Sequence, residues 1–220
     1  MSARTRIKLC GLSRPQDVAA AVALGADAIG LVFYPPSPRH VTPAQAADLL
    51  AQLPAFVTAV GLFVNPELSE VQACIAAAPI SMLRFLGDET PQQCATIAEQ
   101  VRRPFLRALR IRPTTTAADL LEFEHAYRTS SPLFAGLLLD TWSDAYGGTG
   151  KVFDWSLIPA ELAHRAVLSG GLNAQNATDA VRRLRPHAVD VSSGIESAKG
   201  VKDVALMRAF IAAVRSADHE

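Results

Sequence analysis

The sequence predicts an α/β protein that forms a single (β/α)8 TIM barrel over residues 1–220. Short, continuous apolar runs alternate with alanine-rich helical stretches, and such runs are typical of parallel strands covered on both faces. Eight runs occur, and their spacing of about 27 residues suits the βα unit of a compact barrel. No linker or composition break divides the chain, which favours one domain. An open doubly wound sheet is the competing fold, but Gly11-Leu12-Ser13-Arg14 lacks its glycine fingerprint.

The elements follow one another in a regular order. The expected strands occupy residues 7–10, 28–33, 58–64, 81–86, 105–110, 134–140, 166–169 and 188–191. The expected helices occupy residues 15–24, 43–53, 66–77, 91–101, 117–127, 154–162, 173–184 and 202–214. Several helices begin with a proline after a Thr or Asn cap, as at Thr42-Pro43 and Thr90-Pro91. The helix at 154–162 has the weakest pattern because Pro159 interrupts it.

Two reactive side chains close expected strands. Cys10 ends the first strand and Asp140 ends the sixth. The C-terminal ends of all barrel strands meet at one face, where active sites form. A thiol and a carboxyl group at that rim have the chemistry of a base and an acid. Position alone leaves other interpretations open, because cysteine is commonly a small buried hydrophobe and an aspartate can cap the next loop.

Glycine-rich loops follow the last three expected strands. Backbone N–H groups converge on an anion in such loops, and the last two loops of a barrel often hold phosphate. One such loop alone is more often a tight turn, but three together favour a phosphate site. The candidate phosphate-binding residues are Gly147, Gly148, Gly170, Gly171, Ser192, Ser193 and Gly194.

Two further charged residues stand at the predicted rim. Arg39 lies in a loop with three prolines, which suits a side chain that is held in place. Its planar guanidinium matches a carboxylate, although a solvated surface arginine has the same sequence pattern. Asp190 lies near the end of the last expected strand, where the simplest interpretation is a hydrogen bond to the turn at Ser192 and Ser193.

Composition restricts the partners and the compartment. The chain has 21 basic and 21 acidic residues, so nothing in its net charge favours nucleic acid or an anionic membrane as a partner. The three cysteines predict no disulfide framework, and no cluster has metal-binding spacing. Its apolar runs are too short to span a membrane, and residues 1–6 show no signal-peptide core. We expect a reduced, cytoplasmic protein that is a monomer or a homodimer and binds a small phosphorylated molecule.

Several motifs, taken together and in this order, are similar to those of a known family. They include Lys8-Leu9-Cys10-Gly11-Leu12, Ser37-Pro38-Arg39, Leu139-Asp140-Thr141, Gly147-Gly148-Thr149-Gly150, Ser169-Gly170-Gly171-Leu172 and Asp190-Val191-Ser192-Ser193-Gly194-Ile195-Glu196. Over essentially its full length the chain resembles the phosphoribosylanthranilate isomerases, (β/α)8 enzymes of tryptophan biosynthesis. The resemblance implies an Amadori rearrangement of N-(5-phosphoribosyl)anthranilate to 1-(o-carboxyphenylamino)-1-deoxyribulose 5-phosphate.

The resemblance also implies residue roles. The general base falls on Cys10, the general acid on Asp140, and the arginine that meets the anthranilate carboxylate on Arg39. No metal or organic cofactor is implied, because the substrate's own iminium serves as the electron sink. One departure concerns the fourth strand, where the family usually has Gln-Leu-His-Gly or Gln-Phe-His-Gly and this chain has Arg84-Phe85-Leu86-Gly87. This change either loosens the rim or gives Arg84 a new anion contact, and the sequence leaves both open.

Other classes of protein share the predicted barrel. A metal-dependent phosphosugar epimerase would need ligands at several strand ends, and the five histidines do not lie there. A barrel that binds a phosphorylated metabolite without turnover is supported only by the altered fourth strand. A flavin-binding phosphate barrel is a further alternative, and a yellow colour of the purified protein would reveal it.

Overall fold

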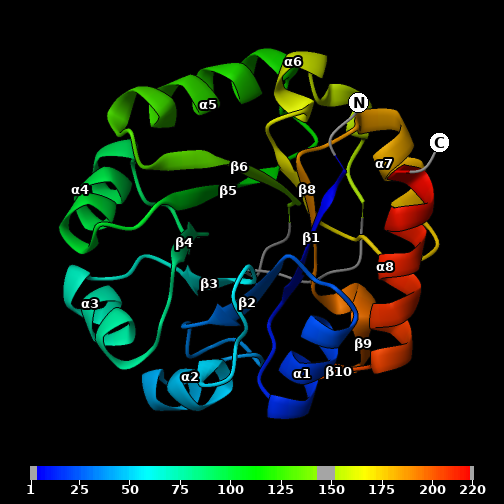
Figure 1. The fold of residues 1–220 in the computed structure, drawn as a ribbon. Coiled ribbons are helices and arrows are strands. Elements are labelled where there is room, and N and C mark those ends of the chain that lie inside the picture. Colours follow the sequence, from blue (N-terminus) through cyan, green and yellow to red (C-terminus); the bar gives the residue numbers. More distant parts are fainter. Residues whose placement is uncertain (1–3, 143–151, 219–220) are drawn as a thin grey trace.

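Eight parallel strands close into one barrel in chain order in the computed structural model, which describes residues 4–142 and 152–218. The strands are β1 Arg6–Cys10, β2 Ala28–Val32, β3 Thr58–Phe63, β4 Met82–Phe85, β5 Phe105–Ile111, β6 Phe134–Thr141, β7 Val167–Leu168 and β8 Ala188–Val191. Each strand pairs with its neighbours in the chain, and the pairing of β1 with β8 closes the ring. The helices surround this ring (Figure 1). The predicted (β/α)8 fold class is confirmed.

The helices cover the outer face of the barrel. They are α1 Pro15–Ala23, α2 Pro43–Leu50, α3 Leu68–Ala77, α4 Pro91–Val101, α5 Ala117–Ser130, α6 Ala160–Ala163, α7 Ala177–Leu184 and α8 Val204–Asp218. Thr42 and Thr90 begin α2 and α4 as predicted, each in a capping box completed by a glutamine three residues later. No helix in the described ranges is long and apolar enough to cross a bilayer.

The sixth and seventh units differ from the prediction. The expected helix at 154–162 is instead a 3₁₀ turn, η1 Trp155–Leu157, followed by the four-residue α6. Pro159 stands between them with a φ of −59° and a ψ of 140°, outside the helical region, because its ring and missing N–H interrupt a helix. Helix α7 begins at Ala177 and not at 173, since Asn173 N donates a hydrogen bond to Asn176 Oδ1 (2.9 Å) in a turn before it.

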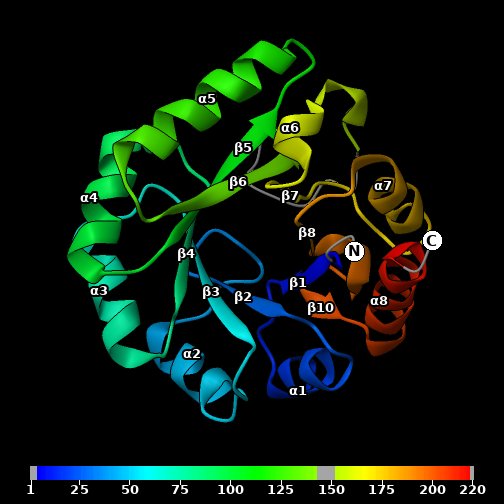
Figure 2. The same cartoon turned by 45° about the horizontal axis from the view of Figure 1, so that its top comes forward.

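A short hairpin follows β8 that the sequence did not predict. It consists of β9 Glu196–Ala198 and β10 Val201–Lys202, which pair antiparallel. The hairpin occupies residues 196–202, and the last helix begins after it at Val204, where the sequence predicts a helix from residue 202. Near the other barrel end, the two described chain ends lie side by side (Figure 2), and Thr5 N donates a hydrogen bond to Asp218 Oδ1 (2.9 Å).

Apolar side chains form two separate clusters. The larger one fills the space between strands and helices and includes Ile7 and Leu9 of β1. The smaller one lies inside the barrel and consists of Cys10, Val32, Leu62, Leu86, Leu106, Ala108, Leu138, Val167 and Ala188. Successive side chains of a strand point to opposite faces, so Lys8, two residues before Cys10, also points into the barrel.

Candidate active site

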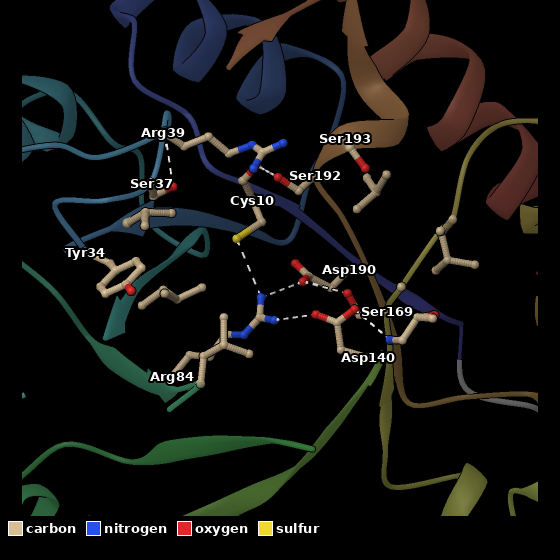
Figure 3. Close-up of a pocket in the computed structure, with 18 of the residues that line it drawn as sticks. Cys10, Tyr34, Ser37, Arg39, Arg84, Asp140, Ser169, Asp190, Ser192 and Ser193 are labelled. Atoms are coloured by element: carbon tan, nitrogen blue, oxygen red, sulfur yellow. Dashed lines mark hydrogen bonds and ion pairs between the residues drawn. The ribbon is translucent and has the colours of Figure 1, made fainter. Parts of the chain in front are cut away.

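A pocket opens where the strands have their C-terminal ends (Figure 3). The sequence-predicted site residues that line it are Cys10, Arg39, Asp140, Gly170, Gly171, Ser192 and Ser193. Gly194 belongs to the same loop as Ser193 but does not line the pocket. Gly147 and Gly148 lie outside the described residues. The pocket also contains Arg84, for which the sequence left a new anion contact open, and Asp190, for which it predicted only a hydrogen bond to the turn at Ser192 and Ser193.

The thiol of Cys10 and the carboxyl group of Asp140 meet at the Arg84 side chain. Arg84 projects from β4 into the barrel, and its Nη1 lies 3.7 Å from Cys10 Sγ. Its Nη2 lies 3.3 Å from Asp140 Oδ2. Figure 3 shows the guanidinium between the two groups. Side chains from β1 and β6 therefore converge in one pocket, as an acid-base pair requires.

Asp140 is held in a largely buried position. Its Oδ1 accepts a hydrogen bond from the backbone N–H of Thr141 (2.8 Å). Burial raises the pKa of the Asp140 carboxyl group; Arg84 opposes the rise, and the nearby Asp190 carboxylate adds to it. A carboxyl group with a raised pKa stays protonated to higher pH, which is the form that a general acid needs.

Asp190 has a different place from the one predicted. Its carboxylate points into the barrel and contacts Lys8 Nζ at 2.6 Å, Arg84 Nη1 at 2.8 Å and Ser169 Oγ at 3.2 Å, in place of the predicted turn. Burial opposes ionisation of Asp190, but the charges of Lys8 and Arg84 outweigh it and lower the pKa. Asp190 is therefore a carboxylate that fixes two buried cations.

Arg39 is buried, so the interpretation of a solvated surface arginine is wrong. Its Nε and Nη2 donate to the two carboxylate oxygens of Glu196 at 2.7 and 2.8 Å. Lys202 Nζ donates to Glu196 Oε1 at 2.7 Å. Gly11 makes room for Arg39, because a Cβ at Gly11 would lie 2.4 Å from Arg39 Cδ. Neither partner was predictable from the sequence, since both Glu196 and Lys202 come from the unpredicted hairpin β9–β10.

The contacts of Glu196 with Arg39 and Lys202 predict a specific dependence of stability on pH. Burial opposes ionisation, but hydrogen bonds from Arg39 and Lys202 outweigh it and lower the pKa of Glu196 from 4.5 to about 2. The folded state thus binds fewer protons, so the stabilisation is complete above the ordinary pKa and is lost as pH falls toward 2. We expect Glu196→Gln to lower the melting temperature at pH 6, with a difference from wild type that shrinks between pH 5 and pH 3. Thermal unfolding of both proteins tests this, and a constant difference would contradict it.

The loops after β7 and β8 pack against each other through their backbones. Gly170 and Gly171 have φ angles of +81° and +67°, which favour glycine. A Cβ at Gly170 would lie 2.4 Å from Thr141 N, and a Cβ at Gly194 would lie 1.9 Å from the carbonyl oxygen of Leu172. Ser192 Oγ also donates to Cys10 O (3.1 Å), which ties the second loop to β1. The two loops therefore form one continuous edge of the pocket.

This packing predicts a large effect of a single methyl group. We expect Gly194→Ala to destabilise the fold by about 1–3 kcal/mol, because the Leu172 backbone must move to admit the Cβ. Ser197→Ala, an exposed change in the same segment, should lie within about 0.5 kcal/mol of wild type. Chemical denaturation measures both, and equal stability of the two variants would show that the loops are not in contact.

The other two cysteines are packing residues, as predicted. Cys74 in α3 and Cys94 in α4 are buried, and burial raises the pKa of their thiols to about 11 and about 12. Within residues 4–142 and 152–218, no group of three or more His, Cys, Asp or Glu side chains is arranged to hold a metal ion.

Comparison with known proteins identifies the family. The model of the N-(5'-phosphoribosyl)anthranilate (PRA) isomerase family matches residues 7–213. The chain belongs to the PRA isomerase family. A PRA isomerase of Herminiimonas arsenicoxydans is 66% identical over 215 residues, which cover 98% of this chain and 95% of the relative. One of Ralstonia nicotianae is 55% identical over 224 residues, which cover 98% and 94%.

Solved structures of PRA isomerases share the fold. The enzyme of Thermotoga maritima superposes with a TM-score of 0.84 at 38% identity and covers 96% of this chain and 99% of its own. A PRA isomerase in complex with reduced 1-(o-carboxyphenylamino)-1-deoxyribulose 5-phosphate has a TM-score of 0.81 at 35% identity, with coverage of 96% and 99%.

Proposed function

We propose that this protein isomerises N-(5-phosphoribosyl)anthranilate to 1-(o-carboxyphenylamino)-1-deoxyribulose 5-phosphate in tryptophan biosynthesis. Membership of the PRA isomerase family supports the reaction. The observation that carries the mechanism is the meeting of Cys10 and Asp140 at one guanidinium inside the pocket. The reaction needs one proton donor and one proton acceptor close to the same sugar, and this pair supplies both.

Asp140 acts first, as the general acid. Its proton passes to the ribose ring oxygen, the bond from that oxygen to C1′ breaks, and the nitrogen lone pair forms the C1′=N double bond of an iminium ion. Burial raises the pKa of Asp140, so that the carboxyl group keeps its proton until the ring opens. The carboxylate that results stays beside Arg84.

Cys10 acts next, as the general base. Its thiolate takes the proton from C2′, and the electrons of that C–H bond form a C1′=C2′ double bond while the iminium nitrogen becomes neutral. The enolamine then tautomerises to the ketone by moving the hydroxyl proton at O2′ to C1′. After turnover Cys10 holds one proton more and Asp140 one proton fewer, so the proton must return before the next cycle.

The two anionic ends of the substrate match two parts of the pocket. We infer that the phosphate lies on the loops after β7 and β8, with Gly170, Gly171, Ser192 and Ser193 at the surface and Gly194 behind them. Gly147 and Gly148 are proposed to join them. The complex of a relative with a reduced 5-phosphate product supports a ligand of this kind in the fold.

Arg39 is proposed to receive the anthranilate carboxylate. Glu196 occupies two of its N–H donors, and a guanidinium has five. The remaining donors are available to a ligand, since Arg39 lines the pocket. Glu196 thus holds the arginine in position while a second carboxylate binds beside it.

A fluorescence assay tests the proposed function. Purified protein should convert phosphoribosylanthranilate, seen as the loss of anthranilate-type fluorescence, and a chelator should not change the rate. Absence of turnover by the folded wild-type protein would refute the proposal. Loss of turnover with the chelator would point to the metal-dependent class of barrel enzyme.

Compartment and assembly complete the proposal. We infer a cytoplasmic enzyme with no nucleic-acid or membrane partner, present as a monomer or a homodimer. The Thermotoga maritima relative is dimeric, and monomers have been generated from it. Sedimentation at several protein concentrations distinguishes the two states for this chain.

A further inference from the structure

We propose that Arg84 is a positioning residue of this reaction: its guanidinium bridges Cys10 and Asp140 and compensates the negative charge on whichever of them is ionised. The inference rests on the proposed function for the order of proton transfers. Arg84 stands where the family that the sequence resembles usually has a glutamine.

The geometry places Arg84 in contact with both reacting groups. It crosses the barrel from β4 to Asp190 on β8, where Nη1 lies 2.8 Å from Oδ2. The same Nη1 is 3.7 Å from Cys10 Sγ, and Nη2 is 3.3 Å from Asp140 Oδ2. The contact with Asp190 fixes the guanidinium, so that its two other contacts need no movement of the arginine (Figure 3).

The burial of Arg84 is difficult to explain by stability alone. The residue is 3% exposed, and its Nε finds no hydrogen-bond partner among the residues that the structure describes. Removing a guanidinium from water without satisfying all its donors is unfavourable, and apolar residues often replace buried ion pairs without loss of stability. A role in the chemistry explains why a cation occupies this place.

The balance of charge supports the same role. Lys8 and Arg84 are cations and Asp190 is an anion, so these three contribute a net charge of +1. A thiolate at Cys10 with a protonated Asp140 brings the sum to zero, as does a thiol with an ionised Asp140. The buried cluster therefore accommodates one negative charge shared by the acid and the base, both before and after the sugar has reacted.

Other charged groups reach the same two residues without bridging them. Arg39 and Lys202 interact electrostatically with Cys10, and both are paired with Glu196. Lys8 interacts electrostatically with Asp140 while its ammonium contacts Asp190. These groups stay the same when Arg84 alone is replaced, so their effect cancels in a comparison of variants.

The test compares Arg84→Gln, Arg84→Lys and the double variant Arg84→Gln with Asp190→Asn. The double variant removes one cation and one anion, so the charge balance is restored while the bridge is absent. Each protein is assayed for kcat and KM against pH, and its thermal unfolding shows whether it is folded.

We expect Arg84→Gln to lower kcat by about 10- to 100-fold, the loss expected when a hydrogen bond to a charged group is removed, while KM changes less than about threefold. Arg84→Lys should recover part of this loss, because it keeps the charge but not the fork. In Arg84→Gln the alkaline fall of the rate should move to higher pH, because Arg84 opposes the raised pKa of Asp140. The double variant should have a melting temperature closer to that of wild type than Arg84→Gln has, and its kcat should remain low.

A merely structural role gives different results. If the folded double variant has the kcat and pH profile of wild type, or if Arg84→Gln does, the proposal is wrong. An inactive wild-type protein would refute the proposed function. The contact between Arg84 and Cys10 can then still be tested, by following the alkylation of Cys10 by iodoacetamide with mass spectrometry. An alkylation rate about tenfold slower in Arg84→Gln than in wild type supports the contact between Arg84 and Cys10 Sγ, and an equal alkylation rate overturns it.

Discussion

Cys10→Ser will lower kcat by about 10²–10⁴, because a serine hydroxyl is a far weaker base than a thiolate at neutral pH. The change is nearly isosteric, so the pocket and its ion pairs should stay in place and substrate should still bind. Calorimetry with the reduced product analogue checks binding, and the fluorescence assay checks turnover. Full activity of Cys10→Ser would remove this residue from the mechanism.

Cys74→Ser provides the matched control for that variant. It makes the same chemical change at a buried cysteine in α3, away from the pocket. We expect kcat close to wild type and a lower melting temperature, because a hydroxyl replaces a thiol in an apolar environment. Equal losses of kcat in the two variants would mean that the effect at Cys10 is one of folding.

Asp140→Asn should cause a loss of similar size, about 10²–10⁴ in kcat, because an amide cannot protonate the ring oxygen. Wild-type activity should also fall as pH rises through the folded pKa of Asp140, since only the protonated carboxyl group is an acid. Burial raises that pKa, so the fall begins at higher pH than for an exposed aspartate. Asp140→Asn should lose this part of the pH profile, and a variant that keeps both its rate and the alkaline fall would exclude Asp140 as the acid.

The stability of Asp140→Asn separates chemistry from folding. A carboxyl group whose pKa is raised in the folded state stabilises the protein most below its unfolded pKa, and this contribution is lost as pH rises through the folded value. The side-chain amide of asparagine is neutral at every pH, so the stability of Asp140→Asn does not fall in this way as the pH rises. We therefore expect Asp140→Asn to melt at least as high as wild type at pH 8, although it is nearly inactive.

The fold was largely predictable because its signals are local. Continuous apolar runs marked the eight strands of the barrel, and Thr-Pro pairs marked the starts of α2 and α4. The predicted sixth helix was wrong in length, because Pro159 divides the stretch into the 3₁₀ turn η1 and the four-residue α6. The hairpin β9–β10 was missed because strands of three and two residues are too short to show a periodic pattern.

The candidate site was predictable where it follows from strand ends. Cys10 and Asp140 lie at the C-terminal ends of β1 and β6 and share a rim because all strands of a parallel barrel point the same way. To predict the buried charged residues behind them, the alternation of side chains along a strand must be considered as well. Lys8 lies two residues before Cys10 and Asp190 two residues after the inward-facing Ala188, so both point into the barrel.

Other parts of the site depend on contacts between distant segments. The partner of Arg39 is Glu196, 157 residues away, and no local pattern joins them. Arg84 likewise meets Asp190 across the barrel, at a separation of 106 residues. Such pairs follow from the closure of the barrel and the path of its loops, which a single sequence does not specify.

A crystal structure with the reduced product analogue would show whether Cys10 and Asp140 face the same sugar. We expect the sugar to lie between them, with Sγ about 3.5 Å from C2′ and a carboxyl oxygen of Asp140 at the oxygen released from the ring. The phosphate should lie on the loops after β7 and β8. A ligand bound in the reverse direction, or a Cys10 sulfur separated from the sugar by intervening side chains, would exclude Cys10 and Asp140 as the acid-base pair.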